Sequence, residues 1–420
     1  MDLDARSHFI RTGKFSAGKF TAGKFSAGSG RLVELDAMRG LAILFVVVYH
    51  LSTSNAGGSQ SEVLSAISRV FSIGWMGVDL FFVLSGFLIG TILLEYSRAP
   101  NFFVAFYARR CARLLPLYLV VLVAYAVARP VLSAQMTDAG SWLIHGEDQA
   151  LPLWSYFFYL QNVFVATSGG WGGHWLAPTW SLAIEEQFYL VAPLLVIWLP
   201  AHRRLAWFVG LAVCAMLLRT WLFVAAGHAG PGFLLLPGRA DALFIGMAGA
   251  AICTDASMRT WLSRNTRLMT AGLWASAAVL IAVLVANVGV QSFVMASIGH
   301  SLLAIMSLNL IFAALFADVW FCRVMLRNRT LIELGGLSYA IYLLHQPMRG
   351  LVWLATTGAT PDFASYGDLP RAVVVIGLTI AAARLSRVWL EQPMLALGHR
   401  VKYRQVASAL TGTSPQAARV

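Results

Sequence analysis

Charged residues are scarce in this chain of 420 residues: only 12% are charged, whereas 58% are hydrophobic. A soluble globular protein carries about 25% charged residues, because its surface faces water. The scarcity of charge, together with a mean hydropathy of +0.70, excludes an ordinary soluble domain. Most of the surface of this protein must face lipid.

Cysteine is also rare, with four residues in the whole chain and no Cys-x-x-Cys pair. Cys111, Cys253 and Cys322 fall near the ends of apolar segments that we expect to lie on the cytoplasmic side, where thiols stay reduced. The pattern favours neither a disulfide framework nor a zinc site, and we expect no metal. The first 30 residues contain no apolar run, so no signal peptide is expected.

Apolar runs of about 20 residues recur along the chain, and each could cross a bilayer core of about 30 Å as a helix. We therefore expect an all-α polytopic membrane protein with about ten transmembrane helices. The predicted spans are roughly 34–54, 74–95, 111–129, 179–199, 205–226, 237–254, 268–288, 297–318, 335–356 and 371–391.

The Lys and Arg residues are distributed unevenly between the two sides of these spans. The segments on one side hold 22 of them, and the loops on the other side hold three, Arg69, Arg129 and Arg371. The positive-inside rule then predicts that both termini are cytoplasmic, in a protein of the cell inner (plasma) membrane. Topology thus accounts for the net charge of +12, and we expect the lipid bilayer rather than nucleic acid as partner.

The chain divides into three predicted regions. Residues 1–33 form a disordered basic cytoplasmic tail, whose repeat GKFSAGKFTAGKFSAG either touches anionic lipid or is merely solvated. Residues 34–395 form the transmembrane domain, and residues 396–420 form a cytoplasmic C-terminal tail. The aromatic stretch Trp154–Val165 is too short to cross and is predicted to be an interfacial or re-entrant helix.

The first span, LDAMRGLAILFVVVYH, carries three polar groups at membrane depth. Arg39 and His50 are 11 residues apart, which places them within about 20° on one helix face, and Asp36 lies within about 40° of His50. Because such groups are costly against lipid, they should face a protein interior or a wet cavity. The plainer alternatives are an interfacial histidine and a local ion pair at a helix end.

Further polar groups are expected in an outer tier, at the depth of His50. Asp79, in GWMGVDLFFVLSGFLIG, could stabilise the cationic form of His50, or could simply favour the helix N-terminus. In TWSLAIEEQFYL, Glu185 and Glu186 point about 100° apart, so only one should face a cavity. The same tier also holds Arg239 and Asp241, in PGRADALFIG.

An inner tier is predicted at the cytoplasmic mouth, where FYARRCARLLPLY follows the second span. Its Arg109, Arg110 and Arg113 would suit a phosphate-rich ligand, although topogenic charge and anionic lipid explain them equally well. Asp36 and Arg39 complete this tier. His345, in LSYAIYLLHQP, has either a packing or a functional role. The two tiers together predict an anionic cytosolic donor with chemistry deeper in the membrane.

These stretches resemble the integral-membrane acyltransferase family 3, of the O-antigen and exopolysaccharide O-acetyltransferase type. The resemblance covers residues 34 to about 393. It implies ten transmembrane helices and transfer of an acyl group, usually acetyl, from cytosolic acyl-CoA to a hydroxyl of a glycan or lipid-linked sugar. Acetyl-CoA is then a donor substrate, and no permanently bound cofactor is expected. Carried over by motif, the functional residues are the essential His50, its partner Arg39, the basic set Arg109, Arg110 and Arg113, and Glu185.

Two mechanisms remain open for this activity. His50 acts as general base on the acceptor, with Asp79 or Glu185 stabilising its imidazolium, or His50 is itself transiently acylated. Either way, the arginines would hold the phosphates of the donor. No GxSxG elbow is present, which argues against a serine nucleophile. The residues we assign to substrate binding are Asp36, Glu186, Arg239, Asp241 and His345.

The competing function is a transporter or flippase that uses an intramembrane His and carboxylate relay. Against it, we find no Gly- or Pro-interrupted spans in corresponding halves, which inverted-repeat carriers show. A membrane scaffold would leave the buried charges without a reason. The sequence makes no prediction of the oligomeric state or of the particular acceptor.

Overall fold

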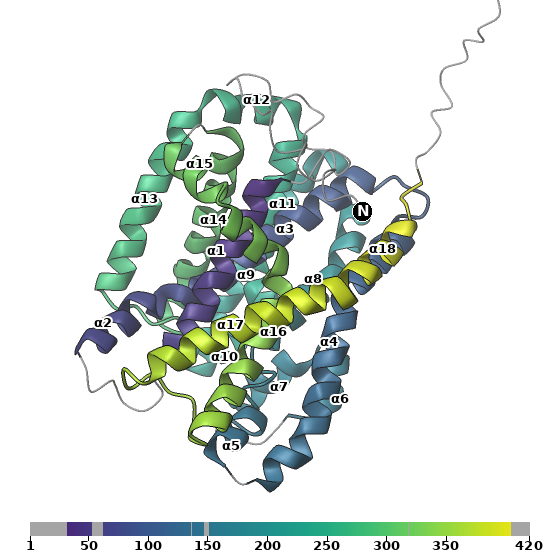
Figure 1. Cartoon of the computed structure of the whole chain (residues 1–420). Coiled ribbons are helices and arrows are strands. Elements are labelled where there is room, and N and C mark those ends of the chain that lie inside the picture. Colours follow the sequence, from purple (N-terminus) through teal and green to yellow (C-terminus); the bar gives the residue numbers. More distant parts are fainter. Residues whose placement is uncertain (1–31, 53–61, 136, 147–150, 318, 405–420) are drawn as a thin grey trace, which may run out of the picture.

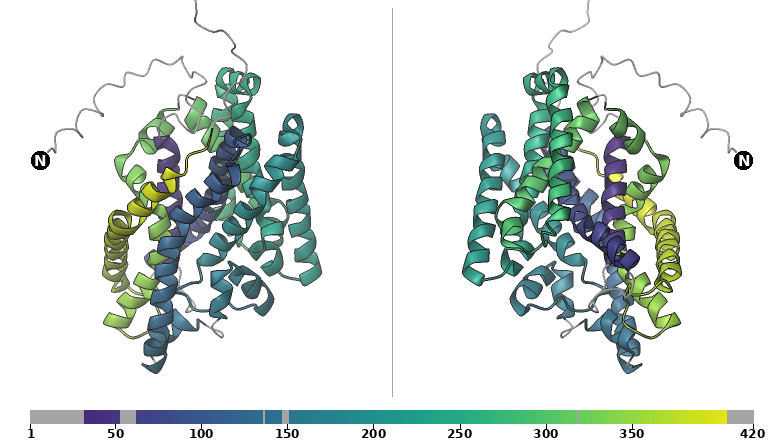
Figure 2. Two further views of the ribbon diagram at one scale, coloured as in Figure 1. Left: turned by 90° about the vertical axis from the view of Figure 1, so that its right-hand side faces the viewer. Right: turned by 90° about the vertical axis from the view of Figure 1, so that its left-hand side faces the viewer.

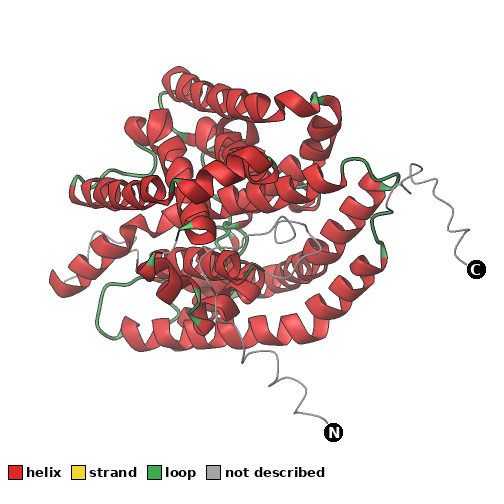
Figure 3. Ribbon diagram, turned by 90° about the horizontal axis from the view of Figure 1, so that it is seen from above, coloured by secondary structure: helices red, strands yellow, loops and turns green. Residues whose placement is uncertain are grey.

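The computed structural model describes residues 32–52, 62–135, 137–146, 151–317 and 319–404. Across these ranges the chain folds as helices without a strand (Figure 3). The predicted N-terminal tail up to residue 31 and the last 16 residues of the predicted C-terminal tail lie outside them.

Ten long helices of the described residues overlap the predicted spans (Figure 1). Their bounds are α1 Val33–Ser52, α3 Met76–Tyr96, α4 Phe102–Ala134, α8 Thr179–Trp198, α9 Arg204–Ala226, α11 Leu236–Thr254, α13 Thr266–Val285, α14 His300–Phe316, α16 Arg329–Thr356 and α17 Asp368–Ser386.

Shorter segments connect or extend the long helices. They are α2 Glu62–Phe71, η4 Ser72–Trp75, α5 Asp138–Ile144, α6 Leu153–Phe157, α7 Gln161–Ser168, η5 Ala201–Arg203, α10 Gly230–Leu234, α12 Ala256–Arg264, η6 Met295–Gly299, α15 Trp320–Leu326, η7 Arg387–Glu391 and α18 Gln392–Arg400.

Nine helical segments in the described part of the chain are long and apolar enough to cross a membrane. The predicted ninth span, 335–356, lies in α16, which has 28 residues but is not among the nine. Polar side chains such as His345, Gln346 and Arg349 lower its hydropathy, and all three are buried in the protein. α16 is thus a helix of spanning length in which these three polar groups are buried within the protein.

The bundle has a buried centre and a lipid-exposed margin. In the centre, α11 and α3 bury 72% and 67% of their most apolar windows, whereas the corresponding share is 6% for α13. Figure 1 shows α13 at the edge of the bundle, and Figure 2 shows α17 and α18 along another outer side. In a bilayer, such a margin exposes apolar side chains to lipid at no cost.

The aromatic stretch before α8 forms two short helices rather than the one predicted. The break between α6 and α7 is at Tyr159, which has a φ of 53°. Around it, Tyr118, midway along α4, donates to the carbonyl of Tyr156 at 2.9 Å, and Gln187 of α8 donates to the carbonyl of Tyr159 at 2.7 Å. Trp154 remains half exposed. At this break, side chains of the neighbouring long helices satisfy two backbone carbonyls.

Glycines permit the closest helix contacts. A Cβ atom built at Gly335 of α16 would overlap the carbonyl oxygen of Asp36 on α1, and one at Gly40 would overlap the carbonyl oxygen of Leu331. Gly86 of α3 lies equally close to the backbone of α11 at Leu243. Small residues at such crossings let backbones approach and pack in lipid. The contact between α1 and α16 sets the distance between the polar faces of those two helices.

We expect Gly335→Ala to lower the free energy of unfolding by about 2 kcal/mol, because its Cβ overpacks the contact with α1. The matched control is Gly377→Ala in α17, where a Cβ meets nothing within 4 Å. There alanine should be neutral or stabilise the helix by up to about 1 kcal/mol. Thermal unfolding in detergent measures both variants. Equal stability of the two would show that the α1–α16 contact tolerates a side chain.

Candidate active site

A cavity of about 80 Å³ lies between α1, α3, α4, α8 and α16. On α3 its walls run from Val78 to Ser85, a rise of about 10 Å along the helix. The cavity therefore extends from the inner basic residues towards the depth of the outer tier. Its lining comprises Arg39, Val78, Phe81, Phe82, Ser85, Arg110, Arg113, Leu114, Ser181, Leu182, Glu185, Tyr189, Ser338, Tyr339 and Tyr342.

Three guanidinium groups face one end of this cavity. Arg39 comes from α1, whereas Arg110 and Arg113 come from α4. The guanidinium of Arg110 also lies 5.7 Å from the ring centre of Tyr189, which holds it against the wall. Three like charges around one space repel each other, so an anion bound there gains from all of them. Phosphate oxygens match the fork of Arg donors well.

Glu185 lies in the wall of the same cavity, where the hydroxyl of Tyr189 donates to it at 3.3 Å. Tyr189 is hydrogen-bonded in turn to Ser85 of α3. The sequence placed Glu185 in the outer tier, but the structure brings it together with the inner arginines. Glu186 is not part of the lining, in line with the expectation that only one of the two glutamates faces the cavity.

His50 pairs with a second histidine. Nδ1 of His50 lies 3.2 Å from Nε2 of His345 on α16 and 2.9 Å from the carbonyl oxygen of Val46. The two ring centres are 4.9 Å apart. Sequence reasoning selected both histidines but did not predict their contact. The contact follows from the close packing of α1 and α16 at Gly335 and Gly40.

Tyr342 connects the cavity to the histidine pair. Its ring lines the cavity and lies 5.9 Å from the ring of His345, centre to centre. Its hydroxyl is hydrogen-bonded to Ser181 at 2.6 Å and donates to the carbonyl of Pro178 at 2.8 Å. The basic end, the tyrosine and the two histidines thus form one continuous arrangement from three helices.

A stack of side chains covers the next turn of α16. Arg349 follows His345 by four residues, and its guanidinium lies 5.2 Å from the ring centre of Trp142 on α5. The ring of His174 is stacked on the ring of Trp142, with 4.2 Å between the ring centres. Burial, and then the charge of Arg349, lower the pKa of His174 to about 4, so this histidine stays neutral. Arg349 and His174 were not selected from the sequence.

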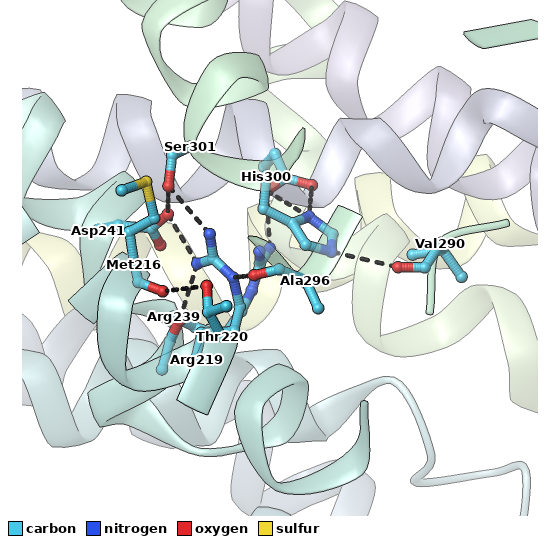
Figure 4. Close-up of polar contacts among 11 residues, drawn as sticks. Met216, Arg219, Thr220, Arg239, Asp241, Val290, Ala296, His300 and Ser301 are labelled. Carbon is cyan, nitrogen blue, oxygen red and sulfur yellow. Dashed lines mark hydrogen bonds and ion pairs between the residues drawn. The ribbon is translucent and has the colours of Figure 1, made fainter. Parts of the chain in front are cut away.

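The outer charged residues form a separate buried network (Figure 4). Arg219 of α9 donates to Asp241 at 2.7 Å, to Ser301 at 2.9 Å and to the carbonyl of Ala296 at 2.7 Å. Ser301 also donates to Asp241 at 2.5 Å. These contacts join α9, α11 and α14. Arg219 was missed by sequence reasoning, although an arginine inside the apolar run LAVCAMLLRTWLFV was itself a signal.

Asp79 belongs to this network and does not lie beside His50. Arg239 donates to Asp79 at 2.7 Å, and Nδ1 of His300 lies 3.3 Å from the same carboxylate. We expected Asp79 to pair with His50 only because the two residues are predicted at the same membrane depth. The carboxylate lies on the side of α3 that packs against α11 and α14, whereas His50 faces α16. Arg239 and Asp241, expected to contact substrate, are both buried in ion pairs.

The remaining inner residues lie outside the cavity lining. Asp36 precedes Arg39 by one turn of α1, close to where α1 contacts Gly335. The Nε group of Arg109 donates to the carbonyl of Val401 at 3.0 Å, and its guanidinium lies 4.8 Å from the ring centre of Tyr403. A strap of residues 401–404 therefore covers Arg109, and the predicted C-terminal tail is in contact with the bundle from its first residues.

We expect Arg219→Met to lower the free energy of unfolding by roughly 3 kcal/mol or more, because it leaves the carboxylate of Asp241 buried without its cation. The control is Arg384→Met, whose ion pair with Glu333 is 60% and 50% exposed. An exposed pair contributes about 1 kcal/mol or less. Thermal unfolding in detergent compares the two, and equal losses would contradict a structural role for the buried network.

Comparison with known proteins places this arrangement in a family. The profile described as "Acyltransferase domain" matches residues 32–386. "Putative peptidoglycan O-acetyltransferase YrhL" of Bacillus subtilis (strain 168) is 28% identical over 386 residues, which are 89% of this chain and 56% of that protein. "O-acetyltransferase OatA" of Staphylococcus aureus (strain NCTC 8325 / PS 47) is 26% identical over 380 residues, 87% of this chain and 57% of that protein.

The chain thus spans a little more than half the length of these relatives. No solved structure matches it. The family profile covers α1 to α17, and with them the cavity, the histidine pair and the outer network. By this match, the chain belongs to the acyltransferase family of multi-helix membrane proteins to which these O-acetyltransferases are related.

Proposed function

We propose that this protein moves an acyl group, in the first instance acetyl, from cytosolic acyl-CoA to a hydroxyl of a surface glycan, exopolysaccharide or lipid-linked sugar. The observation that carries the proposal is the cavity whose basic end leads, through Tyr342, to the pair His50 and His345. The two histidines are not in the cavity lining, but Tyr342 of the lining contacts His345. Transfer from a phosphate-bearing thioester requires an anion site with a proton-accepting group near it.

The donor would bind with its phosphates at the basic end. Arg39, Arg110 and Arg113 supply the charge, and their planar donors fit phosphate oxygens. Arg39 and His50 are 11 residues apart on α1, which is about 16 Å. The pantetheine arm of CoA would bridge this distance along the cavity and present its thioester to the histidine pair. The positive-inside distribution of Lys and Arg supports a cytoplasmic mouth for the donor and cytoplasmic termini.

The chemistry would be general-base catalysis by His50. Its imidazole accepts the proton of the acceptor hydroxyl as the oxygen attacks the thioester carbonyl. A carbon–oxygen bond forms and the carbon–sulfur bond breaks, so the acyl group is transferred as an ester. The proton held by His50 then neutralises the departing CoA thiolate, and the imidazole returns to its neutral form.

The acceptor class is proposed from the relatives and from the location of the site. One relative is named for peptidoglycan, a glycan, and with a cytoplasmic N-terminus His50 would lie in the outer half of α1. A sugar hydroxyl presented from the outer side would reach it there. The protein would act in the inner (plasma) membrane, where the donor is cytosolic and the acceptor belongs to the cell surface.

The first test supplies labelled acetyl-CoA and the glycan fraction of the host to membranes that carry the protein. We expect label to enter the glycan with the wild type and to fall by at least about 100-fold with His50→Ala, since general-base catalysis contributes this much. His202→Ala, at an exposed position in η5, is the control. Undiminished transfer by folded His50→Ala excludes His50 as the base, and no transfer by the wild type with several acyl donors would favour a transporter.

A second test compares the contributions of Arg113 and Arg109 to donor binding. Arg113→Gln should raise the KM for acyl-CoA by about tenfold, the value of one charge-assisted hydrogen bond lost from the cavity. Arg109→Gln should raise it much less, because Arg109 lies outside the lining and contacts the strap. Initial rates over a range of acyl-CoA concentrations give both values. A larger effect at Arg109 would show that the donor phosphates bind at the strap instead.

A further inference from the structure

We propose that His345 is the positioning residue of His50: it holds the proton of His50 on Nδ1, leaves Nε2 to act as the base, and stabilises the imidazolium that forms. This inference rests on the proposed acyl transfer for its catalytic consequence. Its structural content, the direction of one hydrogen bond, is independent of any activity. The tautomers of both rings follow from their neighbours.

The backbone contacts of His345 determine which of its ring nitrogens carries the proton. Its Nδ1 lies 2.8 Å from the carbonyl oxygen of Tyr342 and 3.2 Å from that of Ile341. Carbonyl oxygens only accept hydrogen bonds, so a lone pair on Nδ1 would face two other lone pairs. Nδ1 of His345 must therefore carry the proton. In the neutral ring, Nε2 is then the acceptor.

The proton of His50 follows from that assignment. Nδ1 of His50 lies between two acceptors, the carbonyl oxygen of Val46 at 2.9 Å and Nε2 of His345 at 3.2 Å. A single N–H can be shared between two acceptors in this way. Nδ1 of His50 is therefore the donor, and the lone pair of the neutral ring is on Nε2. That nitrogen is the one that can accept a proton from a hydroxyl.

The same contact stabilises the charged state of His50. When Nε2 of His50 accepts a proton, the ring becomes a cation and its Nδ1–H becomes a stronger donor. Nε2 of His345 already faces this donor, so no group has to move as charge develops. A carboxylate has this role beside the catalytic histidine of serine hydrolases; here a neutral imidazole would supply it.

The two carboxylates expected to support His50 have other partners. Asp79 is bound by Arg239 and His300 in the outer network. Glu185 lies in the cavity wall and accepts from Tyr189. His345, in contrast, reaches His50 directly from α16. Asp79 therefore contributes to helix packing and Glu185 to the cavity wall. Proton transfer is left to the pair His50 and His345.

Two substitutions at one position test the catalytic consequence. His345→Leu removes the acceptor, and we expect kcat to fall by about 100-fold while the KM for acyl-CoA changes by no more than about twofold. In His345→Gln, the side-chain oxygen can replace Nε2 as acceptor, and we expect kcat to return to within about tenfold of wild type. His202→Leu, a histidine-to-leucine change at the exposed site, should leave both constants unchanged, and thermal unfolding confirms that each variant is folded.

These kinetics have outcomes that overturn the proposal. Equal rates for His345→Leu and wild type would remove His345 from the reaction. Equal loss of kcat in the Leu and Gln variants would mean that the acceptor atom is not what His345 contributes. A change confined to KM would instead assign His345 to substrate binding, as the sequence first suggested.

A measurement without substrate keeps the inference separate from the proposed function. In protein labelled with ¹⁵N-histidine, the nitrogen spectrum shows which ring atoms carry protons, and His50→Gln and His345→Gln identify the two rings. We expect a protonated Nδ1 and an unprotonated, hydrogen-bonded Nε2 for His345, whose signal shifts in His50→Gln. A proton on Nε2 of His345 would reverse the hydrogen bond and overturn the proposal, whether or not the protein transfers acyl groups.

Discussion

The contact between α1 and α16 is the constraint on which the candidate site depends. Gly40 and Gly335 let the two backbones meet without intervening side chains. Because the helices approach so closely, the imidazoles of His50 and His345 lie within hydrogen-bonding distance further along the same crossing. The same helices supply Arg39 and Tyr342 to the cavity. A pair of glycines thus controls both the proton-accepting group and part of the anion site.

The buried charges of this protein fall into two sets with different partners. The outer set consists of ion pairs whose members come from α3, α9, α11 and α14, and it joins those helices. The inner arginines line a cavity together with Glu185. An ion-paired set suits packing, because buried charges need partners. Arginines whose guanidinium groups line a cavity suit the binding of an anion.

Sequence reasoning predicted the helices well and the contacts between helices poorly. Apolar runs in the sequence located the ten long helices of the described residues, since length and apolar content are local properties. Within one helix, the 3.6-residue period correctly placed one of Glu185 and Glu186 on the cavity. Between helices, the predicted depth of a residue gives its position along the membrane normal. It does not tell which neighbouring helix the side chain faces. Asp79 and His50 were matched in height, yet their helices turn these groups towards different neighbours. Arg109 likewise could not be separated from Arg110 without knowledge of the strap.

The polarity of α16 has a consequence for how the protein is made. A helix that carries His345, Gln346 and Arg349 partitions into lipid less readily than its neighbours, since each such group is costly in hydrocarbon. Those groups become acceptable only when α1, α5 and the loop before α8 are already in place to receive them. The helix that completes the site would thus enter the membrane as a partner of earlier segments rather than as an independent anchor. Biogenesis of this protein would then couple insertion of α16 to assembly of the site itself.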